Sequence, residues 1–111
     1  MAIGYYELKQ AVKFSFNLKS ANHQVVLASQ TYESKAAAEN GIASVQQNCG
    51  DDSSFERKLS KSDQPYFVLK AANGQVIGQS QMYESAAARD KGIQSVKTNG
   101  PSQEIKDLTG V

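Results

Sequence analysis

The chain has 111 residues, 12 of them basic and 11 acidic, and this size and balance exclude several classes of protein. There is room for one domain, or for two very small units that share a core. No run of about 18 apolar residues could span a membrane, and the N-terminal region lacks the continuous apolar core of a secretory signal. The near-zero net charge argues against a protein that lives wrapped on a polyanion. We therefore expect a soluble, cytoplasmic protein.

The first third of the chain predicts a strand followed by a β-hairpin. Residues 5–9 form the expected first strand. Apolar and polar residues then alternate from 13 to 19, which is the period of a half-buried strand. Asn22-His23 marks the turn of the hairpin, since both residue types tolerate the positive φ that tight turns require.

A helix is expected directly after this hairpin. Ser34 is a natural N-cap, because its hydroxyl can accept a hydrogen bond from a free amide of the first turn. One stripe of the helix then carries small or apolar residues: Ala37, Gly41, Ile42 and Val45. A glycine inside a helix costs about 1 kcal/mol relative to alanine. Its presence predicts that the helix backbone lies close against the sheet at Gly41.

The second half of the chain repeats the first. A shift of 51 residues lays Phe16–Asn48 over Phe67–Asn99, and 19 of the 33 positions are identical without a gap. The second copy therefore predicts a hairpin with an Asn73-Gly74 turn and a helix after Ser85. Outside the matched segments lie a short polar linker and two further candidate strands: 50–54, 55–60 and 103–108.

The predicted fold class is α+β, with two tandem β3-α-β repeats related by pseudo-twofold symmetry. They are expected to form one antiparallel sheet with both helices packed on one face. A unit of about 50 residues buries too little surface to fold well alone, so residues 1–111 are expected to be a single domain made of copies at about 1–54 and 55–111. The expected state is a monomer that is internally a pseudo-dimer. In the alignment of the copies, Leu8 falls on Leu59.

The alternation of side chains predicts which residues face the core. A two-residue turn would place Leu18 opposite Leu27 and point Val25 inward, as well as its counterpart Val76. Val26 and Ile77 would then lie exposed on the sheet face away from the helices. That face would be open and mildly basic, either as a binding surface or as an ordinary solvated face.

Several repeated motifs resemble the YegP-like family of small bacterial proteins. They are the Leu-Lys-(Ala/Ser)-Ala-Asn-x-Gln-Val hairpin, Ser-Gln-x-Tyr-x-Ser, and Gly-Ile-x-Ser-Val-x-x-Asn. The resemblance covers nearly the whole chain. It implies tandem β3-α-β units in which the final strand of each unit crosses to its partner, and single-repeat relatives that dimerise. Because the family is uncharacterised, it supplies no catalytic or binding residues.

Known catalytic and metal-binding patterns are not evident in this sequence. His23 is expected at an exposed hairpin tip. Cys49 is expected at a helix C-terminus, where the helix dipole disfavours a thiolate. Glu33 and Glu84 precede helix N-termini and are best explained by the favourable dipole there. We expect no metal, no cofactor and no enzymatic activity.

Repeated polar residues supply the candidate binding site. We predict binding through three pairs: Lys19/Lys70, Gln30/Gln81 and Tyr32/Tyr83. The tyrosines are also expected to pack at the entrance of each helix, whereas the lysines and glutamines have no evident structural role. The leading hypothesis is a non-enzymatic binding or assembly module with a protein partner. The alternatives are a weak nucleic-acid-binding protein that uses the open sheet face, and an enzyme of unrecognised type.

Overall fold

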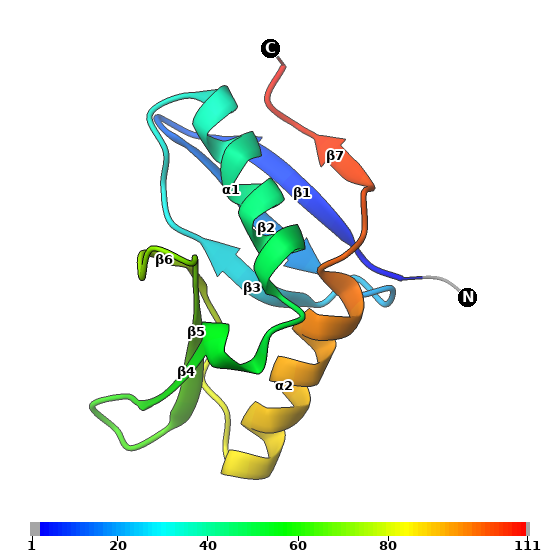
Figure 1. Ribbon diagram of the computed structural model, residues 1–111. Coiled ribbons are helices and arrows are strands. Elements are labelled where there is room, and N and C mark those ends of the chain that lie inside the picture. Colours follow the sequence, from blue (N-terminus) through cyan, green and yellow to red (C-terminus); the bar gives the residue numbers. More distant parts are fainter. Residues whose placement is uncertain (1–2, 111) are drawn as a thin grey trace.

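A mixed sheet and the helices packed on it make up the structure of residues 3–110, described here by a computed structural model (Figure 1). The helices are α1 (Lys35–Asn48), α2 (Ala86–Asn99) and the short 3-10 helix η1 (Asp52–Ser54). The strands are β1 (Tyr5–Gln10), β2 (Phe14–Lys19), β3 (Val25–Ser29), β4 (Phe55–Leu59), β5 (Pro65–Lys70), β6 (Val76–Gln79) and β7 (Ile105–Asp107).

The strand order β4-β5-β6-β3-β2-β1-β7 places one copy in each half of the sheet. The halves meet where β3 pairs with β6, and Ala28 lies opposite Gln79, its own counterpart in the repeat. A pseudo-twofold axis therefore passes through this junction. The α+β class and the two repeats are confirmed.

Two details of the sheet differ from the expected symmetric arrangement. The last strand, β7, pairs with β1 in parallel orientation, whereas the other pairs are antiparallel. Residues 49–54, which follow α1, form a turn and η1 and lead into β4. The first copy therefore has no counterpart of β7, because the chain at that point is used to connect the copies.

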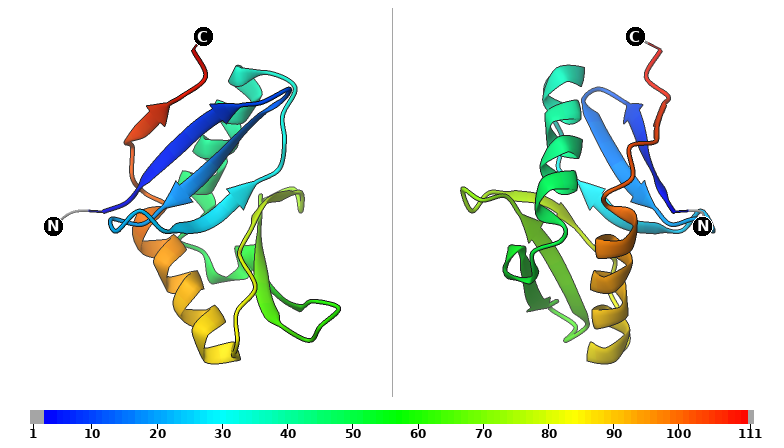
Figure 2. Two further views of the ribbon diagram at one scale, coloured as in Figure 1. Left: turned by 180° about the vertical axis from the view of Figure 1, so that it is seen from behind. Right: turned by 45° about the vertical axis from the view of Figure 1, so that its right-hand side comes forward.

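Both helices lie on one side of the sheet and begin at the predicted caps. Figure 1 shows α1 in front of β1 and β2, and the left view of Figure 2 shows it behind them. The Ser34 hydroxyl accepts the Ala37 N–H at 3.1 Å, and Ser85 does the same for Ala88 at 3.0 Å. Each helix also packs across the junction, α1 on β6 and α2 on β3. The copies are thereby joined by helix packing as well as by strand pairing.

A β-bulge in each hairpin overturns the prediction about Val25 and Val26. The loop has three residues, with Ser20 bonded to Gln24 and His23 at φ 69°. Leu18 still faces Leu27, but Lys19 faces Val25, so Val26 is an extra residue in β3. Bulges change the side to which neighbouring side chains point. Val26 is therefore buried and Val25 is 40% exposed.

The second hairpin has the same bulge and the same consequence. Leu69 faces Gly78, and Lys70 faces Val76. Ile77 is the extra residue and is only 4% exposed. Neither Ile77 nor its counterpart in the first copy lies on an open sheet face, so the predicted apolar exposure there is wrong. Both belong to the core instead.

The alignment of Leu8 with Leu59 is also wrong, because the loop between β4 and β5 is two residues longer than that between β1 and β2. Leu18 pairs with Tyr6 and its counterpart Leu69 pairs with Phe55. Phe55 therefore occupies the position of Tyr6, and Arg57 occupies the position of Leu8. The edge-on ring contacts agree, at 5.8 Å for Tyr6–Phe16 and 5.7 Å for Phe55–Phe67.

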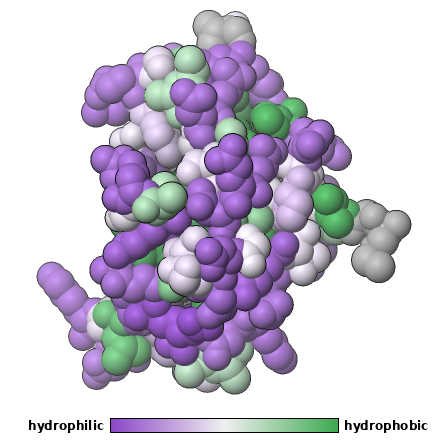
Figure 3. All heavy atoms as spheres, in the orientation of Figure 1, coloured by the Kyte–Doolittle hydropathy of each residue, from purple (hydrophilic) through white to green (hydrophobic). Residues whose placement is uncertain are grey.

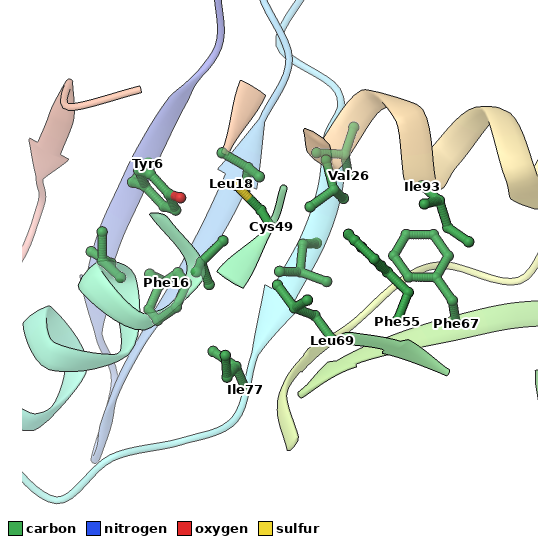
Figure 4. Packing of buried hydrophobic residues seen from close by; sticks show 14 of the residues in the cluster. Tyr6, Phe16, Leu18, Val26, Cys49, Phe55, Phe67, Leu69, Ile77 and Ile93 are labelled. Carbon is green, nitrogen blue, oxygen red and sulfur yellow. The ribbon is translucent and has the colours of Figure 1, made fainter. Parts of the chain in front are cut away.

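The core is one cluster of buried side chains drawn from both copies (Figure 4). Cys49 is 1% exposed and ends α1, while its counterpart at the end of α2 is Gly100. A Cβ on Gly100 would approach the Cys49 Sγ to 2.5 Å, so there is room for one side chain at this place. Tyr6 donates its hydroxyl to the Gly100 carbonyl at 2.6 Å, and burial raises the pKa of Tyr6.

The surface over the helices is mostly hydrophilic, with hydrophobic residues in small separate patches (Figure 3). Within residues 3–110, none of the helices has the length and apolar character needed to span a membrane.

Candidate functional site

One of the repeated polar pairs, Ser29/Ser80, has a structural role. The Ser29 hydroxyl accepts the Phe16 N–H at 2.8 Å and donates to the Gln30 carbonyl at 2.7 Å. Ser80 repeats both bonds with Phe67 and Gln81. Because buried backbone groups require partners, these serines are needed where the chain leaves β3 and β6. Their recurrence is explained by the fold.

The lysines of the predicted site are paired with glutamates. Lys19 Nζ lies 3.2 Å from the Glu7 carboxylate, and Lys70 Nζ lies 3.1 Å from that of Glu56. Glu56 is the structural counterpart of Glu7, so the same ion pair recurs in both copies. The expectation that these lysines lack a structural contact is wrong. Each links the first strand of its copy, β1 or β4, to the second strand on the sheet face away from the helices.

The tyrosines of the predicted site pack between the sheet and the middle of each helix, rather than at the helix entrance. Tyr32 stacks on Phe16 with a centroid distance of 6.2 Å, and Tyr83 stacks on Phe67 at 6.4 Å. A Cβ on Gly41 would approach the Tyr32 Cζ to 2.8 Å, and the equivalent approach at Tyr83 is 2.6 Å. The helical glycine therefore makes room for the tyrosine. Burial raises the pKa of both phenols.

A groove between α1 and the β5–β6 hairpin brings residues of both copies together. We call it the composite groove; its volume is about 260 Å³. Gln30 and Tyr32 of the first copy line it, and so do Asn73 and Gln75 of the second copy. The floor is small and apolar, and the other lining residues are Ala37, Asn40, Gly41, Ser44, Ala71, Val76 and Ile77.

A second hollow of about 310 Å³ shares Ala71 with the composite groove. Lys70 lines it, and so does Asp51, whose pKa is lowered by hydrogen bonds from Ser53. Gln30 and Tyr32 therefore line the composite groove, whereas Lys70 lines the neighbouring hollow. The 51-residue shift relates these residues to Gln81, Tyr83 and Lys19, and we call the surface around Gln81 and Tyr83 the pseudo-equivalent surface.

Sequence reasoning missed part of the composite groove. Asn40 and Ser44 come from the exposed side of a helix, and nothing in their spacing indicates a site. Asn73 and Gln75 were detectable, because the Asn-x-Gln motif is present in both hairpins. The sequence does not show that the Asn-x-Gln motif of one copy lies against the Gln-x-Tyr motif of the other.

The residues considered for catalysis lie apart from this groove. His23 is at the tip of the β2–β3 hairpin, where its Nδ1 is 2.8 Å from the Tyr5 hydroxyl. Cys49 is buried at the end of α1, and burial raises the pKa of its thiol. Glu33 pairs with Lys13 at 2.9 Å. Residues 3–110 contain no cluster of three or more His, Cys, Asp or Glu side chains arranged to hold a metal.

Fold and groove together define a small two-repeat α+β protein with surfaces built jointly by its copies. A family model described as a domain of unknown function, DUF1508, matches residues 10–56 and 60–107. The chain belongs to this family, and the resemblance to YegP-like proteins is confirmed.

Similar proteins cover almost the whole chain. A UPF0339 protein of Acinetobacter baylyi is 56% identical, over 96% of this chain and 98% of its own. The UPF0339 protein YegP of Yersinia pestis is 53% identical, over 98% and 99% respectively.

Solved structures of similar proteins have the same fold. The solution structure of the E. coli protein of unknown function yegP has a TM-score of 0.94 and 46% identity, covering 100% of this chain and 97% of its own. That of the Shewanella oneidensis UPF0339 protein SO3888 has a TM-score of 0.91 and 50% identity, covering 97% and 93%. These relatives carry no assigned activity.

Proposed function

We propose that this protein is a non-enzymatic binding module that contacts a protein partner through the composite groove and its pseudo-equivalent surface. One observation carries the proposal: Gln30 and Tyr32 of one copy line a groove with Asn73 and Gln75 of the other. These motifs recur in both copies, so a binding role in the groove would account for the repeated glutamines, of which Gln81 also hydrogen-bonds to Tyr83.

The chemistry of the groove suits binding better than catalysis. Its lining offers amides and hydroxyls over a floor of small apolar residues. Tyr32 is the titratable residue in that lining, and burial raises its pKa, so the phenol stays protonated at neutral pH. General base catalysis needs a group whose pKa lies near the working pH. This argument supports the non-enzymatic proposal.

The charges on the outer sheet face do not favour nucleic-acid binding. Lys19 and Lys70 are each within 3.2 Å of a glutamate carboxylate. A phosphate-binding surface instead presents cations that can neutralise the backbone. We also propose a cytoplasmic location. Cys49 is buried and is not part of a disulfide, which is compatible with a reducing compartment.

Affinity capture with matched glutamine variants tests the proposed function. Immobilised wild-type protein, a variant with the glutamines of both surfaces changed (Gln24→Ala/Gln30→Ala/Gln75→Ala/Gln81→Ala) and the control Gln47→Ala/Gln103→Ala are exposed to the same bacterial lysate. Gln47 and Gln103 are exposed and lie outside the groove. We expect a protein retained by wild type and control, and reduced about tenfold with the groove variant, which corresponds to about 1.4 kcal/mol.

A reconstituted complex would complete this test by titration calorimetry. Two pseudo-equivalent surfaces predict up to two partner molecules for each chain. Equal retention of every captured protein by all three baits would contradict the proposal.

A further inference from the structure

The two edges of the sheet differ, although the internal repeat makes the strands β1 and β4 equivalent. β1 and β4 are equivalent strands, since each pairs with the first strand of its own hairpin in the same register. β1 is covered by β7, which lies alongside it in Figure 1. β4 is the terminal strand at the other end of the sheet. One of two equivalent edges is therefore occupied by a parallel strand and the other is open.

Backbone geometry shows which hydrogen bonds the open edge of β4 can form. On β1, the Tyr6 N–H donates to the Glu104 carbonyl at 2.9 Å, and the Leu8 carbonyl accepts the Leu108 N–H at 2.7 Å. The equivalent residues of β4 are Phe55 and Arg57, so their backbone N–H and C=O groups must point away from β5. The Phe55 N–H is already used by the Asp52 carbonyl. The Phe55 carbonyl and both Arg57 backbone groups are left for another strand.

A groove beside β4 has room for the side chains of such a strand. Its volume is about 480 Å³, and it lies between Arg57 and one side of α2. Ile93 and Ala87 give it an apolar part, and Asp90 and Lys91 give it a charged part. Tyr6 and Leu8 face the core, so their partners Ile105 and Asp107 project on the helix side of the sheet. Side chains at these two positions of a strand on β4 would point toward this groove.

The charge at the edge indicates the sequence of the occupant. Leu8 is opposite Asp107 in the β1–β7 pair, and Arg57 holds the place of Leu8 on β4. Arg57 already contacts the carboxylates of Asp90 at 3.2 Å and Asp52 at 3.8 Å, but Arg89 and Lys97 contact the same two carboxylates, so cations outnumber carboxylates at this edge. An acidic residue opposite Arg57 would balance this charge as a cross-strand pair. Phe55 holds the place of Tyr6, which is opposite Ile105, so an apolar residue suits the position two residues earlier. The matching pattern is apolar-x-acidic in an extended segment.

We propose that the β4 edge binds an extended segment of another protein with this apolar-x-acidic pattern, parallel to β4, by β-strand addition. The segment continues the sheet in the manner in which β7 continues it at β1. A second copy of this chain fits less well, because its β7 would have to leave its own β1 and no strand pairing would be gained. The site is independent of the composite groove.

A peptide with the sequence of residues 103–110 is the probe, because it carries the Ile-Lys-Asp pattern of β7. It is titrated into isotope-labelled full-length protein, and amide chemical shifts are followed by NMR. We expect saturable shifts in Phe55–Leu59 and along the side of α2 that faces the groove. A peptide in which lysine and aspartate exchange places should bind about tenfold more weakly or less.

Three variants separate the backbone from the groove. Arg57→Ala removes the guanidinium that lines the groove and keeps the backbone N–H. Arg57→Pro also removes this outward N–H from an edge strand, where proline leaves the ladder to β5 intact, so the difference between the two variants reports the backbone contribution. Ala87→Arg fills the groove from α2, and Ala36→Arg is its matched control at the equivalent exposed position of α1. We expect binding to fall about tenfold or more in Arg57→Pro and Ala87→Arg, and to be unchanged in Ala36→Arg.

Three results would overturn the proposal. The first is no shift at millimolar peptide. The second is shifts confined to β1 with loss of binding in Ala36→Arg, which would mean that the peptide replaces β7. The third is peptide-free association of the protein through β4, which would make the edge a contact between copies.

Discussion

At the scale of single residues, a glycine and a tyrosine act together in each copy. Gly41 lies against Tyr32, and Gly92 lies against Tyr83, at the same place in the two helices. Glycine lowers the helix propensity at this position, but it leaves the space that the aromatic ring fills. The recurrence of a glycine inside both helices was therefore a correct sign of close packing, although the sequence could not show that the neighbour is a side chain from the segment before the helix.

Gly41→Ala should destabilise the protein even though alanine is the better helix former. Propensity favours alanine by about 1 kcal/mol, but overpacking a filled site typically costs about 1–3 kcal/mol. A Cβ here would approach the Tyr32 Cζ to 2.8 Å and its hydroxyl more closely still. Urea unfolding should show a net loss of roughly 1 kcal/mol or more, partly relieved in the double variant with Tyr32→Phe.

Gly50→Ala is the matched control for this substitution. A Cβ on Gly50 meets no atom within 4 Å, and the residue is exposed. Its substitution should leave the free energy of unfolding unchanged within about 0.5 kcal/mol. Equal stability of the Gly41 and Gly50 variants would disprove the close-packing explanation.

At the scale of elements, the docking of β7 depends on charge. It is short, and its Asp107 carboxylate lies 2.5 Å from Lys35 Nζ on α1. Hydrogen bonds from Lys35 and Thr109 lower the pKa of Asp107 to about 2. A lowered pKa means that the carboxylate stabilises the docked strand above the ordinary aspartate pKa of 3.8, and that this contribution is lost as the pH falls toward 2.

We therefore expect β7 to loosen between about pH 4 and pH 2 before the rest of the sheet does. The measurement is the cross-strand NOE intensity and the amide shifts of Tyr6 and Leu108, whose N–H groups donate the backbone hydrogen bonds between β1 and the C-terminal segment. Asp107→Asn should weaken docking already at neutral pH and remove the acid transition. A transition that persists unchanged in that variant would assign it to another group.

The elements themselves were largely predictable, because local patterns determine them. The N-cap serines, the 51-residue shift and the alternation in the hairpins gave both helices and most strands at the right places. Two predictions about the strands were wrong, for physical reasons that the hydrophobic pattern of the sequence does not show. A three-residue loop plus a bulge reverses the faces of Val25 and Val26, and a longer β4–β5 loop shifts Arg57 into the place of Leu8. Register depends on loop geometry, which residue types indicate only weakly.

The candidate site was less predictable than the fold, because it depends on contacts between the copies. Repetition singled out Gln30 and Tyr32, which line the composite groove, and their role in binding stays a prediction. It could not separate them from Lys19 and Lys70, whose glutamate partners lie on strands outside the matched segments. The pairing of motifs from different copies follows from the pseudo-twofold axis, which becomes visible only when β3 is placed beside β6.

At the scale of the whole molecule, the segment that connects the two copies leaves the sheet one strand short of a symmetric arrangement. The segment after α1 must reach β4, so it cannot also lie alongside β4 as β7 lies alongside β1. Residues 55–111 contain three strands, a helix and β7, which makes them a complete β3-α-β unit. Residues 1–54 lack the final strand. The two halves should therefore differ when each is produced alone.

Residues 55–111 should form a homodimer, because about 57 residues bury too small a share of their surface to be stable alone. β6 would pair with β6 across the twofold axis, and β7 of each chain would lie on β4 of its partner. Arg57 would then face the partner's Asp107, an opposite-charge pair that the tandem chain lacks. Size-exclusion chromatography with light scattering should give the mass of a dimer, and mixed-label NOEs should join Arg57 to Asp107. Residues 1–54 should be unfolded or form a weaker dimer, and a stably folded monomer of either half would contradict the shared core.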